Sequence, residues 1–249
     1  MDRPSVLVVA GYDQSAGAGV LSDIKTLEAH EVYGYAVVTG LTFQNEREIR
    51  RVDWLGLEDI FEQIDLCYAS AAFDWVKIGI TASMRMAGAI IDHLRGYNPG
   101  VRIVLDPVIR ASSGQAFWGE LTDEWEYVAA RCFLITPNWE EIGWLYPGED
   151  IETRCAAMTK EGQLHIYLKG GHNREHPGRD YLWSNGEVEV LGAVETGRTI
   201  TSKHGSGCVL SSALAANLAL GYPLPIAAER AKRYIERFLS SNKTLLGWH

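Results

Sequence analysis

Short apolar runs alternate with amphipathic segments along most of the chain, and this alternation limits its possible folds more than any other feature. The first run, residues 5–10, is almost wholly apolar and ends at a glycine, which is typical of a strand buried on both faces of a parallel sheet. Residues 18–30 then show the apolar spacing of a helix that packs on a sheet. The alternation predicts an α/β fold, a doubly wound and mostly parallel central sheet flanked by helices.

The same pattern continues through the rest of the chain. Further strands are predicted at residues 35–41, 75–80, 101–105, 132–136 and 164–168. Further helices are predicted at residues 57–72, 84–95, 123–130, 138–146, 207–220 and 225–240. Residues 179–191 instead predict a small β-hairpin, because Asn185-Gly186 at their centre favours a tight turn. No shift in composition marks a boundary, so residues 1–249 are expected to form one domain.

Charge and cysteine content exclude several classes of function. The net charge is −9 and the acidic residues are dispersed, which argues against nucleic acid or an anionic membrane as the main partner. The four cysteines lie far apart without C-x-x-C spacing, which argues against a zinc site and against a disulfide framework. No apolar stretch is long enough for a signal peptide or a membrane span. A reducing compartment, the cytoplasm, is the expected location.

Residues 201–208 run directly into a helix of small residues, and Gly205 and Gly207 lie at the junction. Glycines one residue apart allow a sharp turn with bare N–H groups, and the helix adds the positive end of its dipole. The pattern predicts an anion site and favours a thiolate at Cys208 in the first helical turn. A plain glycine turn before a core helix with an inert cysteine is the alternative.

Other polar motifs follow predicted strands, and ligands of open α/β sheets bind beyond the carboxyl ends of strands. Residues 11–19 are small enough for close approach of a ligand, but they lack the G-x-G-x-x-G spacing of a dinucleotide site. Asp106, before a proline, is either a turn cap or a group beside a metal or phosphate. Asn138 and Glu141 have the spacing of a capping box, and equally of two oxygen ligands for magnesium. Lys169 is either a solvated strand end or the partner of a phosphate.

Taken together, these motifs resemble the ribokinase-like kinases, and within them the hydroxymethylpyrimidine/phosphomethylpyrimidine kinases of thiamine biosynthesis. The resemblance spans residues 6 to about 240, with seven motifs in the family's order. The motifs are residues 11–26, 41–45, 77–79, 106–108, 136–141, 169–172 and 204–208. The chain departs from the family pattern at Ser22, Phe43, Ser202-Lys203 and Ser206. Phe43 is expected to crowd the pocket of the pyrimidine-reading Gln44.

The resemblance implies that the γ-phosphoryl group of ATP is transferred to 4-amino-5-hydroxymethyl-2-methylpyrimidine and then to its monophosphate. It implies that Cys208 accepts the hydroxymethyl proton, while Lys169 offsets developing charge. Gly205, Ser206, Gly207 and Cys208 would form the anion hole, and Asp106, Asn138 and Glu141 would hold Mg²⁺. The residues implied to bind the pyrimidine are Gly11, Asp13, Ala18, Asp23, Gln44 and Val108. Those implied to bind ATP are Asn138, Glu141, Lys169, His204, Gly205 and Gly207. The resemblance also implies a homodimer.

Two other functions compete with this one. Pyridoxal kinases share the scaffold and phosphorylate a hydroxymethyl group on a similar flat ring, but Gln44 and a cysteine at position 208 favour the pyrimidine. The amide of Gln44 can donate to a ring nitrogen and accept from an amino group. A catalytically silent pyrimidine-binding module is also conceivable, because a fold does not prove activity. The set of phosphate-handling residues argues against it.

Overall fold

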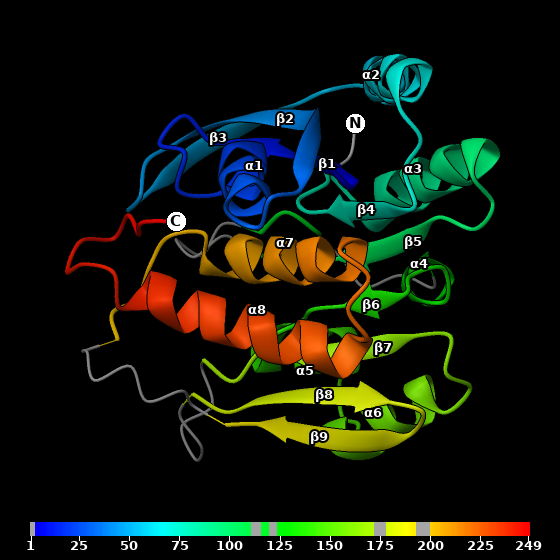
Figure 1. Cartoon of the computed structure of the whole chain (residues 1–249). Helices are drawn as coiled ribbons and strands as arrows, with labels where there is room; N and C mark the ends of the chain where they lie inside the picture. The colour runs from blue at the N-terminus through cyan, green and yellow to red at the C-terminus, as the bar shows by residue number, and fades with distance from the viewer. Residues whose placement is uncertain (1–2, 111–115, 120–123, 172–177, 193–199) are drawn as a thin grey trace.

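The computed structural model describes residues 3–110, 116–119, 124–171, 178–192 and 200–249. Within these ranges nine strands form one sheet in the order β3-β2-β1-β4-β5-β6-β7-β8-β9, as Figure 1 shows. The strands are β1 (Ser5–Tyr12), β2 (Tyr33–Gln44), β3 (Ile49–Trp54), β4 (Trp75–Ile78), β5 (Arg102–Leu105), β6 (Leu134–Ile135), β7 (His165–Leu168), β8 (Asp180–Ser184) and β9 (Glu187–Leu191). The helices are α1 (Gly19–Ala29), α2 (Leu57–Ser70), α3 (Met84–Tyr97), α4 (Glu124–Ala129), α5 (Trp139–Leu145), α6 (Ile151–Thr159), α7 (Ser206–Ala219) and α8 (Leu224–Leu239).

The predicted doubly wound, mostly parallel sheet is confirmed. Strands β2, β1, β4, β5, β6 and β7 pair in parallel, while β3, β8 and β9 are antiparallel. The predicted hairpin is β8–β9, and Asn185 and Gly186 at its turn have φ of 53° and 78°. These positive values are what a two-residue hairpin turn requires. The hairpin is also part of the sheet, because β8 pairs with β7.

Two elements were not expected from the sequence. Strand β3 is rich in charged side chains, and it forms because it pairs with β2, which extends to Gln44 rather than ending at Leu41. Helix α6 has a weak apolar stripe, with only Cys155 and Thr159 buried. Its first turn is held by Asp150, whose side chain accepts a hydrogen bond from the Thr153 N–H. The start of the helix predicted at 123–130 lies outside the described residues.

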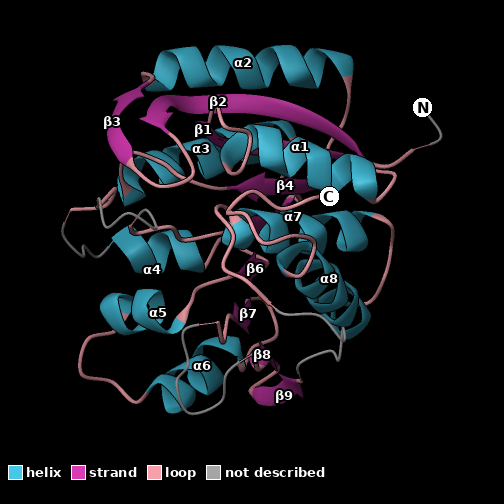
Figure 2. Ribbon diagram, turned by 90° about the vertical axis from the view of Figure 1, so that its left-hand side faces the viewer, coloured by secondary structure: helices cyan, strands magenta, loops and turns pink. Residues whose placement is uncertain are grey.

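Helices cover both faces of the sheet because successive side chains of a strand point to opposite sides. Leu7 and Val9 of β1 belong to the core beneath α2, α3, α4, α5 and α6. Val6 and Val8 belong to the core beneath α1, α7 and α8. Figure 2 shows these two layers of helices on either side of the strands. None of the helices in the described ranges is long and apolar enough to cross a membrane.

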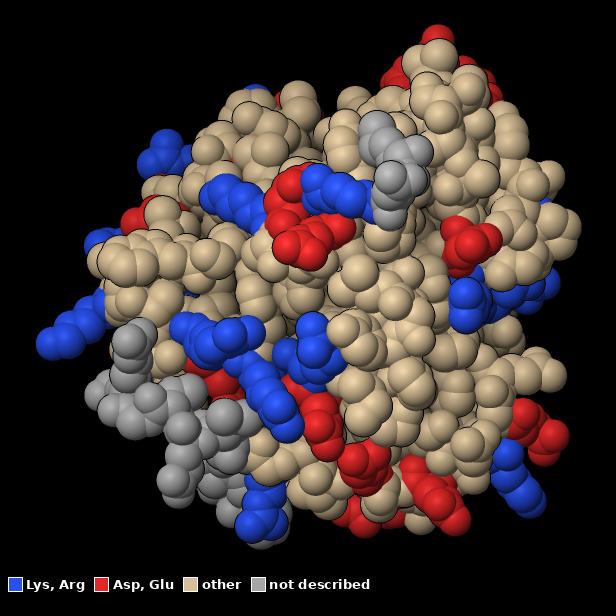
Figure 3. Space-filling model, viewed as in Figure 1, with Lys and Arg blue, Asp and Glu red and all other residues tan. Residues whose placement is uncertain are grey.

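The chain order places a crevice at the carboxyl end of β1. Strand β1 lies between β2 and β4, so the connections after β1 and after β4 diverge to opposite sides. Such a switch in strand order is where open α/β sheets bind ligands. On the face shown in Figure 3, Lys and Arg side chains are interspersed with Asp and Glu rather than gathered into a broad basic surface.

Candidate active site

A cavity of about 710 Å³ lies at this crevice, a volume within the ordinary range for small-molecule sites. It is lined by residues at the carboxyl ends of β1 and β2, by residues that follow β4, β5 and β7, and by residues at the starts of α1, α5 and α7. Most of the predicted site residues line it, namely Gly11, Ala18, Gln44, Asp106, Val108, Asn138, Glu141, Lys169, His204, Gly205, Ser206, Gly207 and Cys208. Asp13 and Asp23 are not among the lining residues.

The glycine-rich turn before α7 requires glycine for two reasons. Gly205, the N-cap of α7, has φ of 72° and ψ of 13°, the left-handed region that favours glycine. A Cβ at this position would also lie 2.0 Å from the carbonyl oxygen of Gly17 in the loop after β1. No side chain caps this helix, and the Ser206 N–H donates to Lys203 O, so the N–H groups of Gly207 and Cys208 are the ones available to an anion in the cavity.

Cys208 lies in the first turn of α7 and lines the cavity. Burial raises the pKa of its thiol to about 11, although the Lys77 ammonium and the Gly19 N–H act in the opposite direction. The raised pKa runs against the thiolate expected at Cys208 from its place at the helix N-terminus. Removal from water outweighs the helix dipole, whose effect on one group is about 0.3–1 kcal/mol.

Lys169 forms the centre of a cluster of charges at the end of β7. Its Nζ lies 2.9 Å from Asp106 Oδ1 and 3.4 Å from Glu141 Oε2. Burial opposes the positive charge, but the two carboxylates raise the pKa of Lys169 above its ordinary value. The alternative of a solvated strand end is wrong, because only 14 % of the side chain is exposed. The lysine stays charged beside the cavity, where it can stabilise negative charge.

The capping box predicted at α5 is confirmed. Asn138 Oδ1 accepts a hydrogen bond from the Glu141 N–H at 2.8 Å, and Glu141 Oε2 accepts one from the Asn138 N–H at 2.7 Å. Both residues also line the cavity, so the cap holds their side chains at its wall. Burial raises the pKa of Glu141, although Lys169 acts to lower it.

Asp106 has one oxygen that nothing in the described residues satisfies. Its Oδ1 accepts hydrogen bonds from Thr136 and Lys169, whereas its buried Oδ2 has no hydrogen-bond partner. That oxygen lies near α7, 3.4 Å from where a Cβ on Gly207 would be. An unpaired carboxylate oxygen and a nearby glutamate are hard ligands of the kind that Mg²⁺ prefers. No group of three or more ligating side chains forms among the described residues, so phosphate oxygens and water would have to complete the coordination.

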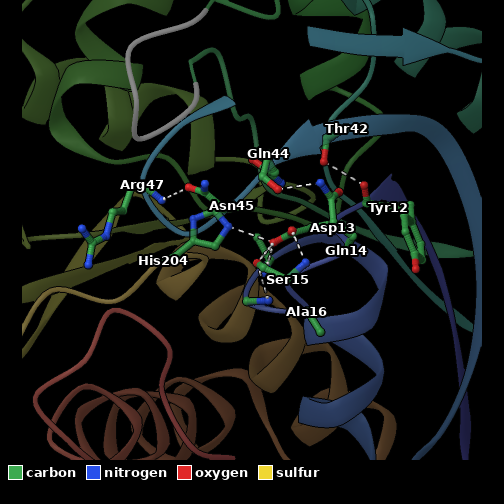
Figure 4. Close-up of polar contacts among 12 residues, drawn as sticks. Tyr12, Asp13, Gln14, Ser15, Ala16, Thr42, Gln44, Asn45, Arg47 and His204 are labelled. Atoms are coloured by element: carbon green, nitrogen blue, oxygen red, sulfur yellow. Dashed lines mark hydrogen bonds and ion pairs between the residues drawn. The ribbon is translucent and has the colours of Figure 1, made fainter. Parts of the chain in front are cut away.

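Asp13 and Asp23 are fully buried, do not line the cavity and form hydrogen bonds within the protein. The carboxylate of Asp13 accepts hydrogen bonds from Ser15, from the Ala18 N–H and from His204 Nε2, which lies 2.8 Å away (Figure 4). Burial acts to raise the pKa of Asp13, but these hydrogen bonds, His204 first, lower it overall. The prediction that Asp13 contacts the pyrimidine is not supported, because its oxygens are used within the protein.

Asp23 is also fully buried and pairs with Lys77, whose Nζ lies 2.7 Å from Asp23 Oδ2. Ser212 of α7 donates to the other oxygen, Asp23 Oδ1, at 2.7 Å. The pair therefore joins α1, β4 and α7 beneath Cys208. As for Asp13, direct contact of Asp23 with the pyrimidine is not supported, and the geometry indicates a supporting role.

Gln44 and Phe43 lie on opposite sides of β2. Gln44 lines the cavity, and its backbone oxygen accepts a hydrogen bond from Gln14 Nε2 at 2.6 Å (Figure 4). Phe43 is 37 % exposed, and the Arg51 guanidinium lies over its ring at 3.6 Å. The expected crowding of the pocket by Phe43 is therefore wrong, because adjacent strand residues face opposite ways.

Several cavity residues were not predicted from the sequence. They include Thr42, Ile80, Ile109, Arg110, Phe117, Trp144 and Lys203. Lys203 is buried because residues 240–249 fold over it, and its Nζ donates to the backbone oxygens of Asn242 and Thr244. No local signal could reveal that contact. The place of Arg110, two residues after the 106–108 motif, is a signal that could have been used. His172, in the 169–172 motif, lies outside the described residues.

Comparison with known proteins agrees with this geometry. The family described as phosphomethylpyrimidine kinase matches residues 13–249. The chain belongs to the phosphomethylpyrimidine kinase family. The hydroxymethylpyrimidine/phosphomethylpyrimidine kinase of Rhizobium meliloti (strain 1021) is 34 % identical over 246 residues, which cover 94 % of this chain and 90 % of that protein. The resemblance seen in the sequence is confirmed.

Solved structures support the fold of this phosphomethylpyrimidine kinase family member. The crystal structure of phosphomethylpyrimidine kinase from Clostridium difficile 630 has a TM-score of 0.75 and 29 % identity, and it covers 94 % of this chain and 98 % of that one. The pyridoxal kinase from Staphylococcus aureus in complex with ADP has a TM-score of 0.81 and 21 % identity, with 98 % and 90 % covered. At 21 % identity, the similarity to the pyridoxal kinase shows a shared fold and nothing more.

Proposed function

We propose that this chain transfers the γ-phosphoryl group of ATP to 4-amino-5-hydroxymethyl-2-methylpyrimidine, and then to the monophosphate so formed. One observation carries the proposal. Gln44, able to read an aminopyrimidine edge, and the glycine-rich turn at Gly205–Cys208, able to bind a phosphoryl group, line the same cavity. Family membership supports the same reaction.

In this reaction Cys208 accepts the proton of the attacking hydroxymethyl group. The hydroxymethyl oxygen forms a bond to the γ-phosphorus as the bond to the β-phosphate oxygen breaks, and ADP leaves. The proton goes to the Cys208 sulfur, so the thiol must first be deprotonated. Lys77 and the Gly19 N–H favour that deprotonated form against the effect of burial. The reaction should therefore accelerate as the pH rises.

Positioning and charge stabilisation supply the rest of the rate enhancement, as is usual in phosphoryl transfer. The N–H groups of Gly207 and Cys208 in the first turn of α7 bind the transferring group, and Lys169 offsets its negative charge. The unpaired Asp106 Oδ2 and Glu141 would hold Mg²⁺, which neutralises phosphate charge when bound. The same capping box that begins α5 orients Glu141 toward that position.

A pyridoxal kinase activity is the second candidate, because the pyridoxal kinase from Staphylococcus aureus has the same fold. The test compares kcat/KM for the hydroxymethylpyrimidine and for pyridoxal in the wild type and in Gln44→Ala. Each buried hydrogen bond lost is worth about 1–3 kcal/mol, so the variant should lose about 5- to 150-fold on the pyrimidine and little on pyridoxal. A wild-type kcat/KM for pyridoxal equal to or above that for the pyrimidine would overturn the proposal. Absence of any ATP consumption would favour the silent module instead.

The homodimer and the cytoplasmic location stay predictions made from the sequence. They rest on the family resemblance and on the cysteine pattern, respectively. Equilibrium sedimentation of the purified chain would measure the first. A monomer at micromolar concentration would contradict it.

A further inference from the structure

Arg110 is a cation of the cavity whose charge is not committed to a partner. The other basic side chains that line the cavity are engaged. Lys169 is paired with two carboxylates, Lys203 donates to Asn242 and Thr244, and His204 contacts Asp13. Within the part of the chain that the structure describes, Arg110 makes no hydrogen bond or ion pair, and its side chain is exposed. Its guanidinium is therefore available to a ligand.

The position of Arg110 is at the acceptor end of the cavity. It follows β5, and the chain returns beside it, with a bridge between Arg110 and Ala116 and a hydrogen bond from the Phe117 N–H to Ile109 O at 2.8 Å. The Phe117 ring contacts Trp54 of β3 edge to face, with centroids 5.9 Å apart. Strand β3 pairs with β2, which ends at Gln44. Arg110 therefore approaches the cavity from the side that carries the pyrimidine-reading residue.

The two acceptors in the proposed reaction sequence differ mainly in charge. The pyrimidine alcohol is neutral, whereas a phosphomonoester carries about −1.5 to −2 near pH 7. Three carboxylates line the cavity, those of Asp106, Glu140 and Glu141, against the ammonium groups of Lys169 and Lys203. Without Arg110 the lining therefore carries a net negative charge. A phosphorylated acceptor would be repelled unless a further cation met it. A guanidinium suits this task because its planar fork binds two phosphate oxygens at once.

We infer that Arg110 is the specificity residue for the second transfer. Its guanidinium binds the phosphate of the pyrimidine monophosphate and holds that group toward the glycine-rich turn of α7, where the second phosphoryl group arrives. The inference rests on the proposed function, because it assigns a residue to one of its two substrates. It predicts that Arg110 changes the preference between the two acceptors, not only the overall rate.

The experiment measures kcat/KM for the alcohol and for the monophosphate in the wild type, Arg110→Gln and Arg110→Lys. Hydrogen bonds to a charged group are strong enough that Arg110→Gln should lower the ratio of monophosphate to alcohol kcat/KM by about 10- to 100-fold. Arg110→Lys keeps the charge but loses the fork, so its ratio should lie between the two. Rising salt should weaken monophosphate use in the wild type more than in Arg110→Gln.

Arg51→Gln is the matched control, because Arg51 is exposed, pairs with Asp53 and does not line the cavity. Its acceptor ratio should equal that of the wild type within twofold. An unchanged ratio in Arg110→Gln, with both acceptors still turned over, would overturn the inference and leave the proposed function intact. A wild type that phosphorylates neither pyrimidine would overturn the proposed function itself, and the inference with it.

Discussion

Replacing Lys77 by methionine should strongly destabilise the protein. Lys77 and Asp23 are both fully buried, and their charged atoms lie 2.7 Å apart. The variant would leave the Asp23 carboxylate in the core with Ser212 as its remaining side-chain donor. Removing one partner of a buried ion pair costs about 3–5 kcal/mol, because the other charge stays uncompensated. For a chain of this length that corresponds to a fall in Tm of about 6–20 °C.

The loss should depend on pH in a defined direction. Burial already raises the pKa of Asp23 above its ordinary 3.8, although Lys77 acts to lower it, so removing Lys77 raises that pKa further. A carboxyl with a higher pKa in the folded state binds protons preferentially in that state. The variant should therefore be least stable at neutral and alkaline pH. Part of its stability should return as the pH falls through the raised pKa, because Asp23 becomes neutral.

Thermal and urea unfolding at pH 5 and pH 8 would measure this effect in Lys77→Met, Asp23→Asn and the double variant. The double variant has no buried charge at this pair and should be more stable at pH 8 than Lys77→Met by about 2 kcal/mol or more. Lys160→Met, at an exposed position, is the control for the substitution itself and should change stability by less than about 0.5 kcal/mol. A loss below 1 kcal/mol in Lys77→Met, equal at both pH values, would refute the reasoning.

Three further predictions concern the cavity. Cys208→Ala should lower kcat by about 10²–10⁴-fold while ATP binding is retained. Because the pKa of Cys208 is raised to about 11, kcat/KM of the wild type should rise with pH, and a coupled ADP assay should show no such rise in the variant. Glu141→Gln can still cap α5 but lacks the charge, so titration should show a higher Mg²⁺ requirement with little change in Tm. A variant that melts earlier with unchanged Mg²⁺ dependence would show that Glu141 serves only as a helix cap. Gly205→Ala should weaken ATP binding measured by calorimetry, because its Cβ would lie 2.0 Å from Gly17 O. Gly148→Ala is the control, because Gly148 also has a positive φ but a Cβ there would meet nothing within 4 Å, and this variant should leave ATP binding unchanged.

Strong patterns among residues close together in the chain predicted local structure correctly. The alternation of apolar runs located the parallel strands, and Asn185-Gly186 located the hairpin. The spacing of Asn138 and Glu141 predicted the capping box, and both of its hydrogen bonds form. Strand β3 escaped notice because its stability comes from pairing with β2, a contact that a charged six-residue segment does not reveal.

The structure places most of the predicted site residues on one cavity, but the motifs did not show which other side chains each of them contacts. The motifs correctly placed Gln44, Lys169 and Cys208 on one cavity, because parallel strands bring their carboxyl ends to one edge of the sheet. They did not reveal that Asp13 and Asp23 are fully buried and do not line it. Each carboxylate is held by a side chain far along the chain, His204 at a separation of 191 residues and Ser212 at 189.

The sequence by itself determined most of the strands and helices, the capping box of Asn138 and Glu141, the hairpin turn at Asn185-Gly186, and the family to which the chain belongs. All of these depend on residue types at short, regular separations. Only the tertiary structure decided the raised pKa of Cys208, the burial of Lys203 and the outward direction of Phe43. These properties depend on which polar groups lose contact with water and on partners that folding brings together from distant parts of the chain, and no local pattern reveals such partners.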